Sequence, residues 1–136
     1  MNIIHLMESM TQVISFDFDD TLCSSEGSPN MDMISKIWQH HANGDECIIV
    51  TARNKDHEEK DWINKNEPGR TKVVDFISKY NLPITKIVYT NHLLKGPILK
   101  KYNAILHYDD NEEQLASTGS HGVTPIKVNN GKSKND

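Results

Sequence analysis

Three aspartates stand within four positions of the segment "SFDFDDTLC", residues 15–23, at the end of an apolar run. Like charges so close together repel one another, and aspartate is a poor strand former. Asp17 and Asp19 have the spacing of a strand, so their carboxylates would face a common space while Phe18 turns toward the core. The segment is therefore either a solvated acidic turn or a place where a cation holds the carboxylates together.

Further residues that could join this site follow the other apolar runs of the sequence. They are, in chain order, Thr51, Arg53, Lys95, Asp109 and Asp110. Ligands of an open parallel sheet bind beyond the carboxyl ends of its strands, so we expect these side chains to converge on one edge.

Four carboxylates in two acidic pairs keep their charge only beside a cation, and an all-oxygen ligand set suits Mg²⁺. Mg²⁺ keeps coordination positions open for the oxygens of a substrate phosphate. Lys95 and Thr51 would then neutralise and hydrogen-bond the remaining phosphate oxygens. The pattern indicates a phosphoryl-transfer site, which Arg53, His57 and His92 could also reach.

The elements that would carry these residues alternate along the chain. Continuous apolar runs, typical of strands buried on both faces, occupy residues 13–16, 47–50, 87–89, 104–106 and 125–128. Helical spacing of apolar residues occupies residues 34–41, 73–80, 98–102 and 112–119. In the charged stretch 56–64, only Trp62 and Ile63 could anchor a helix. This order predicts an α/β fold, a three-layer Rossmann-like arrangement around a five-stranded parallel sheet.

Composition limits the class of protein. The chain has 136 residues, 36% hydrophobic and 25% charged, which fits one domain over residues 1–128 with a tail over 129–136. Its net charge of -4 argues against a sequence-blind nucleic-acid binder. No apolar run approaches the roughly 18 residues of a membrane span, and residues 1–10 lack the features of a signal peptide. Cys23 and Cys47 form no zinc or disulfide pattern, so we expect a reduced cytoplasmic protein.

Four segments of the chain resemble the four motifs of the haloacid dehalogenase superfamily of phosphohydrolases. The first motif, an apolar strand followed by Asp-x-Asp-x-Thr, matches residues 14–21, and the second, a strand ending in Ser or Thr, matches residues 47–51. The third, a lysine that begins a helix, matches Lys95 in "NHLLKGPILKKYN", and the fourth, a strand ending in paired acids, matches "AILHYDD". The resemblance covers residues 12–128.

This resemblance implies a role for each matched residue. Asp17 would be the nucleophile that forms a phospho-aspartyl intermediate. Asp19 would protonate the leaving oxygen and then activate water, and its backbone carbonyl would also bind Mg²⁺. Thr51 and Lys95 would hold the phosphoryl group. Asp109 and Asp110 would complete the metal shell, and the sequence leaves open which of them contacts the metal directly.

Two alternatives concern the lysine and the class of protein. Lys100 and Lys101 compete with Lys95, but they fall well inside the expected helix, so Lys95 is preferred. A non-catalytic phosphate-binding scaffold or a phosphoacceptor receiver domain could also carry clustered acids, a threonine and a lysine. A receiver would place its acceptor aspartate after the third strand, where this chain has Thr90-Asn91. The order of residues therefore favours the phosphohydrolase.

The spacing of the motifs leaves no room for a cap domain of roughly 50 residues, so we expect an open site with the segment "CSSEGSPN" as its flap. The segment between Thr90 and Asp110 is most similar to capless nucleotidases and to the 3′-phosphatase domains of polynucleotide kinases. We predict a nucleotide or another small phosphomonoester as substrate, ahead of a DNA or RNA 3′-phosphate end. The basic track that such an end needs is limited to Arg53, Lys55 and Lys95. The sequence leaves the oligomeric state and a lid from a neighbouring subunit open.

Overall fold

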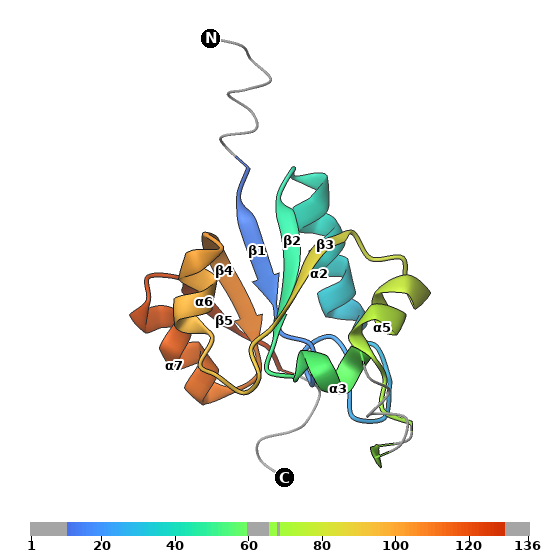
Figure 1. The fold of residues 1–136 in the computed structure, drawn as a ribbon. Helices are drawn as coiled ribbons and strands as arrows, with labels where there is room; N and C mark the ends of the chain where they lie inside the picture. Colours follow the sequence, from blue (N-terminus) through green and yellow to red (C-terminus); the bar gives the residue numbers. More distant parts are fainter. Residues whose placement is uncertain (1–10, 60–65, 68, 130–136) are drawn as a thin grey trace.

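The computed structural model describes residues 11–59, 66, 67 and 69–129, and the fold is drawn in Figure 1. The strands are β1 (Val13–Phe16), β2 (Glu46–Thr51), β3 (Ile84–Tyr89), β4 (Ala104–Asp109) and β5 (Thr124–Lys127). The helices in the described part are α2 (Met31–Ala42), α3 (Lys55–Glu59), α5 (Val73–Lys79), α6 (Gly96–Lys101) and α7 (Glu112–Ser120). Trp62, Ile63 and residues 130–136 of the expected tail lie outside the described residues.

All five strands are parallel and follow the order β3-β2-β1-β4-β5, which confirms the predicted five-stranded parallel sheet. From β1 the chain adds β2 and β3 on one side, and then β4 and β5 on the other. The crevice between β1 and β4 is thus the topological switch point, where doubly wound sheets bind ligands. Receiver domains share the flavodoxin-like order 2-1-3-4-5, which differs from the order found here.

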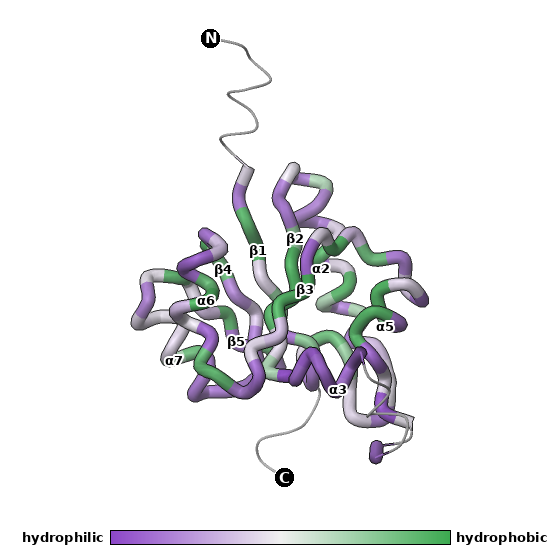
Figure 2. The backbone as a smooth tube through the Cα atoms, viewed as in Figure 1, coloured by the Kyte–Doolittle hydropathy of each residue, from purple (hydrophilic) through white to green (hydrophobic). Residues whose placement is uncertain are grey.

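Helices cover both faces of the sheet, and each face has its own core (Figure 1). On one side Ile14 and Phe16 of β1 pack with the apolar residues of α2 and α5. On the other, Ile48 and Val50 of β2 pack with Leu99 of α6. Because both faces are buried, β2 is apolar from Cys47 to Val50, as Figure 2 shows.

Local sequence explains where the helices begin and end. The side chain of Asn30 caps α2 by accepting a hydrogen bond from the Met33 backbone N–H at 3.4 Å. After α5, Asn81 adopts a positive φ of 51°, and Leu82-Pro83 leads into β3. The expected helices therefore exist close to their predicted bounds.

The helical spacing of residues 34–41 groups Trp38 and His41 on one face with Ile34 and Ile37, but the structure separates them. Trp38 and His41 are exposed, and Trp38 retains 42% of its accessible surface. Met33, Ile34 and Ile37 already fill the buried face, and Trp38 lies about 100° around the helix from Ile37. The rings of Trp38 and His41 instead contact each other edge to face, with centroids 5.7 Å apart.

The strands at the two edges also differ slightly from their predicted bounds. β3 begins at Ile84, three residues before the continuous apolar run, because this edge strand includes the polar, exposed residues Thr85 and Lys86. β5 begins at Thr124 and includes Pro125, which an edge strand tolerates because one side of it carries no partner.

Between β1 and β2 every residue is described, and the chain there forms only a loop and α2, with no inserted domain. Within the described residues, no helix has the length and apolar character needed to cross a membrane.

Candidate active site

The carboxyl ends of the central strands bring the predicted residues to one edge of the sheet. Asp17 follows β1 directly, Thr51 is the last residue of β2, and Asp109 is the last residue of β4. Lys95 is the N-cap residue of α6, which precedes β4 in the chain. Asp17 and Asp109 therefore flank the switch point between β1 and β4.

A buried lysine joins the two aspartates. The Lys95 Nζ donates hydrogen bonds to Asp17 Oδ1 and to Asp109 Oδ2, each at 2.8 Å, and its side chain is 1% exposed. The Thr21 hydroxyl donates to the other oxygen of Asp17 at 3.0 Å. The rival lysines, Lys100 and Lys101, are both exposed on α6. Among the three, Lys95 is the one that contacts the carboxylates.

Asp110 completes a group of carboxylates that could hold a metal. One carboxylate oxygen from each of Asp17, Asp109 and Asp110 lies within 4.8 Å of the others. Three carboxylates and the Lys95 ammonium leave two negative charges, which one divalent cation would balance. The all-oxygen donor set suits Mg²⁺ better than a softer metal, so the residues present fit the ion that the sequence predicts.

Burial sets the protonation of these groups. Burial raises the pKa of Asp17 to about 8, and the Lys95 ammonium opposes that rise. Burial alone would also raise the pKa of Asp109, but a hydrogen bond from His107 and the charge of Lys95 hold it below its ordinary range. Burial lowers the pKa of Lys95 less than the two carboxylates raise it, so the lysine stays charged. The charge on Asp17 is therefore the least favourable in this cluster when no cation is bound.

Asp19 is oriented differently from its neighbour. Its carboxylate accepts hydrogen bonds from Arg53 Nε at 2.9 Å and from Arg53 Nη2 at 2.7 Å, and Arg70 Nη2 lies 3.6 Å away. β1 ends at Phe16, and Asp20 adopts a positive φ of 62°, so strand alternation does not continue through this turn. The carboxylates of Asp17 and Asp19 accordingly have separate cationic partners. The Mg²⁺ contact expected from the Asp19 backbone carbonyl stays a prediction.

Arg53 lies inside the protein rather than on its surface. Its guanidinium donates to Glu58 Oε1 at 2.5 Å and to the backbone carbonyl of Thr71 at 2.7 Å, and it stacks 4.8 Å above the centre of the Phe18 ring. With Asp19, these contacts engage all three guanidinium nitrogens and one face of the group. Its expected contact with substrate stays a prediction, and the contacts seen show it orienting Asp19.

Glu58 is a residue that sequence reasoning did not single out. It is 5% exposed, and its second oxygen accepts a hydrogen bond from the Val73 backbone N–H at 3.1 Å, which links α3 to α5. In the sequence it stands in a charged stretch that gives no sign of burial. Only its spacing of five residues from Arg53 could have suggested the pairing.

The remaining predicted residues lie at the same end of the sheet. Thr51 is fully buried, and its hydroxyl oxygen accepts a hydrogen bond from the Arg53 backbone N–H at 3.3 Å. His57 and His92 line a cavity of about 190 Å³ together with Arg53 and Arg70. The loops after β2 and β3 are joined here, since the His92 backbone N–H donates to the Ala52 carbonyl at 2.7 Å.

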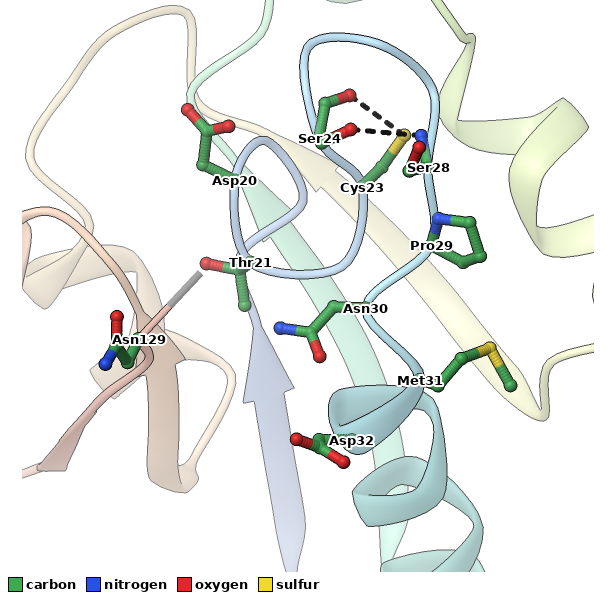
Figure 3. Close-up of a pocket in the computed structure, with 10 residues that line it drawn as sticks. All are labelled: Asp20, Thr21, Cys23, Ser24, Ser28, Pro29, Asn30, Met31, Asp32 and Asn129. Atoms are coloured by element: carbon green, nitrogen blue, oxygen red, sulfur yellow. Dashed lines mark hydrogen bonds between the residues drawn. The ribbon is translucent and has the colours of Figure 1, made fainter. Parts of the chain in front are cut away.

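A second cavity, of about 370 Å³, opens beside the turn that carries the first motif (Figure 3). Asp20 and Thr21 of that turn line it, and the expected flap contributes Ser24, Ser28 and Pro29. The Ser28 backbone N–H donates to the Ser24 hydroxyl at 3.0 Å, which closes the flap on itself. The start of α2 and Asn129 complete the lining of this cavity.

Comparison with known proteins supports the fold. No family profile and no curated protein matches the chain. Two solved structures of the Pnkp1/Rnl/Hen1 complex, one described as an RNA repair complex, contain a chain of similar fold. One has a TM-score of 0.62 and 16% sequence identity over 88% of this chain and 43% of that chain. The other has a TM-score of 0.65 and 17% identity over 92% and 48%. This chain therefore spans less than half the length of the chains it matches.

Proposed function

We propose that this chain is a magnesium-dependent phosphomonoesterase of the haloacid dehalogenase type. The observation that carries the proposal is the Lys95 ammonium, held at 2.8 Å from both Asp17 and Asp109 beside the carboxylate of Asp110. This group lies at the switch point of a parallel sheet, where ligands of such sheets bind. Clustered carboxylates, a lysine and a strand-end threonine are the parts that phosphoryl transfer by positioning and charge stabilisation requires.

In the first step, an oxygen of Asp17 attacks the phosphorus atom of the substrate. A bond forms between Asp17 and phosphorus, the ester P–O bond breaks, and the leaving oxygen takes a proton from Asp19. The carboxylate of Asp19 is 44% exposed, so a leaving group can reach it from solvent. Lys95 and Thr51 would neutralise and hydrogen-bond the phosphoryl oxygens.

In the second step, Asp19 removes a proton from water, which attacks phosphorus and releases inorganic phosphate from Asp17. Splitting the displacement into two steps lowers the barrier of each. Asp17, Asp109 and Asp110 would hold Mg²⁺, which when bound neutralises charge on the phosphoryl oxygens. Arg53 would keep the Asp19 carboxylate at its position in both steps.

The charges of the described residues favour a small substrate with one phosphate. Each cation that the sequence offered for a basic track has an acidic partner. Lys95 pairs with Asp17 and Asp109, Arg53 with Asp19 and Glu58, and Lys55 with Glu59 at 3.7 Å. A long polyanion would gain little from cations already neutralised. We therefore place a nucleotide or other small phosphomonoester first. The free thiols of Cys23 and Cys47 support the proposal of a reducing, cytoplasmic location.

The second candidate is a phosphatase that acts on the 3′ ends of DNA or RNA. The observation in its favour is the similarity in fold to chains solved within a complex described as an RNA repair complex. Both candidates share the chemistry above and differ in the group attached to the phosphate.

Phosphate release decides between these candidates. The wild-type protein is assayed with nucleoside monophosphates, sugar phosphates and 3′-phosphorylated oligonucleotides, each with Mg²⁺ or EDTA and at two salt concentrations. We expect turnover that EDTA abolishes, with the highest kcat/KM on a nucleoside monophosphate and little dependence on salt. Preference for the oligonucleotide, weakened by salt, would establish the second candidate. Turnover that is independent of Mg²⁺ would contradict the mechanism, and activity confined to sugar phosphates would contradict both substrate classes.

A further inference from the structure

A buried pair of polar side chains extends from the candidate metal cluster into the sheet. His107 Nε2 lies 2.8 Å from Asp109 Oδ2, and His107 Nδ1 lies 2.8 Å from the Ser15 hydroxyl. Both side chains are completely buried. Nothing in the sequence indicated a partner for His107.

The sheet itself places these residues. His107 stands two positions before Asp109 on β4, so both side chains emerge on the same face of the strand. Ser15 of β1 is the cross-strand partner of His107 in the parallel ladder. On the opposite side of β1, the partner of Ser15 is Ile48, which belongs to the apolar core beneath α6. A serine and a histidine therefore occupy positions where apolar residues would complete that core.

Hydrogen-bonding rules fix the direction of this chain of contacts. The Asp109 carboxylate is an acceptor, so the hydrogen between it and His107 must lie on Nε2. A neutral ring protonated at Nε2 leaves Nδ1 as an acceptor, and the Ser15 hydroxyl, 2.8 Å away, donates to it. Ser15 thus favours the one neutral tautomer of His107 that can donate to Asp109.

These contacts restrain the Asp109 carboxylate at both oxygens. Oδ2 accepts hydrogen bonds from His107 and from Lys95, each at 2.8 Å. Oδ1 accepts one from the Asn111 backbone N–H at 3.1 Å. Among the side chains of the described residues that hydrogen-bond Asp109, His107 is the one that is neither a candidate metal ligand nor the phosphate-binding lysine.

We infer that His107, held in its Nε2–H tautomer by Ser15, is a positioning residue that orients Asp109 toward Mg²⁺ and Lys95. The inference rests on the proposed function for the identity of the cation. Groups that orient a metal ligand from behind commonly change metal affinity by about 10–100-fold when they are removed. A histidine serving the core alone would affect folding and leave metal affinity unchanged.

Mg²⁺ binding to the metal-free protein, measured by calorimetry, tests the inference without using catalysis. We expect His107→Leu to weaken Mg²⁺ binding about 10-fold or more. His107→Gln keeps a donor near the Nε2 position and should restore most of the affinity. Ser15→Ala, one contact further from the metal, should weaken binding about threefold, as the loss of one modest hydrogen bond would.

Tyr108→Phe is the matched control. It removes a partly buried hydrogen bond of 2.9 Å between the Tyr108 hydroxyl and His40 Nε2, on the opposite face of the same strand. It should lower the melting temperature in EDTA and leave Mg²⁺ affinity unchanged. Equal losses of affinity in Tyr108→Phe and His107→Leu would overturn the inference, as would a folded His107→Leu that binds Mg²⁺ as tightly as wild type.

If His107→Leu does not fold, the Mg²⁺ affinity of Ser15→Ala and the tautomer of His107 in the wild-type protein test the inference instead. Nitrogen chemical shifts of the wild-type ring should show the proton on Nε2, and a proton on Nδ1 would overturn the inference. A wild-type protein that binds no Mg²⁺ contradicts both this inference and the proposed function. Weakened binding in the variants of a protein that hydrolyses no phosphomonoester supports the inference and contradicts the function alone.

Discussion

At the scale of single residues, the site is a set of charges that balance only when a cation is present. Asp17 carries the least favourable of these charges, because burial raises its pKa while Lys95 must also serve Asp109. Replacing Asp17 by asparagine removes the nucleophile and also removes a charge that is costly in the metal-free protein.

We therefore expect Asp17→Asn to abolish turnover while the free energy of unfolding in EDTA stays equal to that of wild type or rises. Phosphate release and urea unfolding would measure the two effects. Asp75→Asn, an exposed substitution in the first turn of α5, is the control. It should leave turnover unchanged and lower the free energy of unfolding by no more than about 1 kcal/mol, through loss of a favourable charge at the helix N-terminus. Near wild-type activity in Asp17→Asn would show that another group is the nucleophile.

Variants of Arg53 can separate two effects of this residue: its contribution to the free energy of unfolding through the ion pair with Glu58, and its contribution to catalysis through Asp19. Arg53→Ala leaves Glu58 buried without its cationic partner, and breaking such a pair typically costs about 3–5 kcal/mol. Arg53→Ala with Glu58→Gln removes both charges and should recover much of this stability. Because Asp19 loses its partner in either protein, kcat should stay low in both.

Urea unfolding and steady-state kinetics on the two variants test this expectation. Recovery of kcat together with stability in the double variant would show that Arg53 acts only by holding the fold together.

At the scale of elements, α6 sets the position of Lys95, and α7 sets the position of α6. The backbone N–H of Lys95 donates to Gln114 Oε1 at 2.8 Å, and that of Gly96 donates to the Ser117 hydroxyl at 3.0 Å. A Cβ on Gly96 would lie 2.4 Å from the Ser117 carbonyl oxygen and 2.4 Å from His121 Nδ1. The two helices can approach this closely only because residue 96 is glycine.

Gly96→Ala should therefore push α6 away from α7 and move the Lys95 ammonium from its two carboxylates. Overpacking of this kind typically costs about 1–3 kcal/mol of stability, and kcat should fall with it. Gly119→Ala is the matched control, because its added Cβ would make only ordinary van der Waals contact with Pro125, 3.6 Å from Cγ and 3.9 Å from Cδ. Gly119 lies within α7, where alanine should stabilise by about 0.5–1 kcal/mol. Unchanged kcat in a destabilised Gly96→Ala would show that α6 does not position the lysine.

The site residues that could be predicted from the sequence are those that stand at the end of a strand or directly after it. Asp17, Thr51 and Asp109 follow continuous apolar runs, and parallel strands end at a common edge. Contacts between distant segments were not predictable, because the residue types alone do not select the partners. Glu58, on the charged helix α3, forms a buried ion pair with Arg53. Ser15 hydrogen-bonds His107, which is 92 positions away in the sequence. In both pairs, burial in the folded protein selects the partner. The local sequence around Glu58 gave no sign that this residue is buried.

At the scale of the whole molecule, the buried sheet contributes to the free energy of unfolding and also positions the candidate metal ligands. Burial raises the pKa of Cys47 on β2 to about 11, above the value of about 8.5 that an unfolded chain would have. A group whose pKa is raised on folding contributes stability below the unfolded pKa and loses it as the pH rises toward the folded pKa. The free energy of unfolding should therefore fall between about pH 8.5 and pH 11.

Urea unfolding of wild type and Cys47→Ala across pH 7–10.5 tests this linkage. Cys47→Ala should be less stable at pH 7, because it leaves a cavity, but its stability should fall less steeply above pH 8.5. Equal slopes for the two proteins would show that another group dominates the alkaline loss.

Mg²⁺ should stabilise the whole fold, because its ligands come from the ends of two central strands that the unfolded chain does not bring together. A ligand that binds only the folded state at 100 times its Kd stabilises it by about 2.7 kcal/mol. For a domain of this size that corresponds to a rise in melting temperature of roughly 10 °C. Asp110→Asn should lose most of this rise, whereas Glu113→Gln, which changes an exposed acid in the first turn of α7, should keep it. Thermal unfolding of the three proteins in EDTA and in Mg²⁺ measures the difference. An equal rise in all three would place the bound Mg²⁺ away from Asp110 and contradict the proposed metal site.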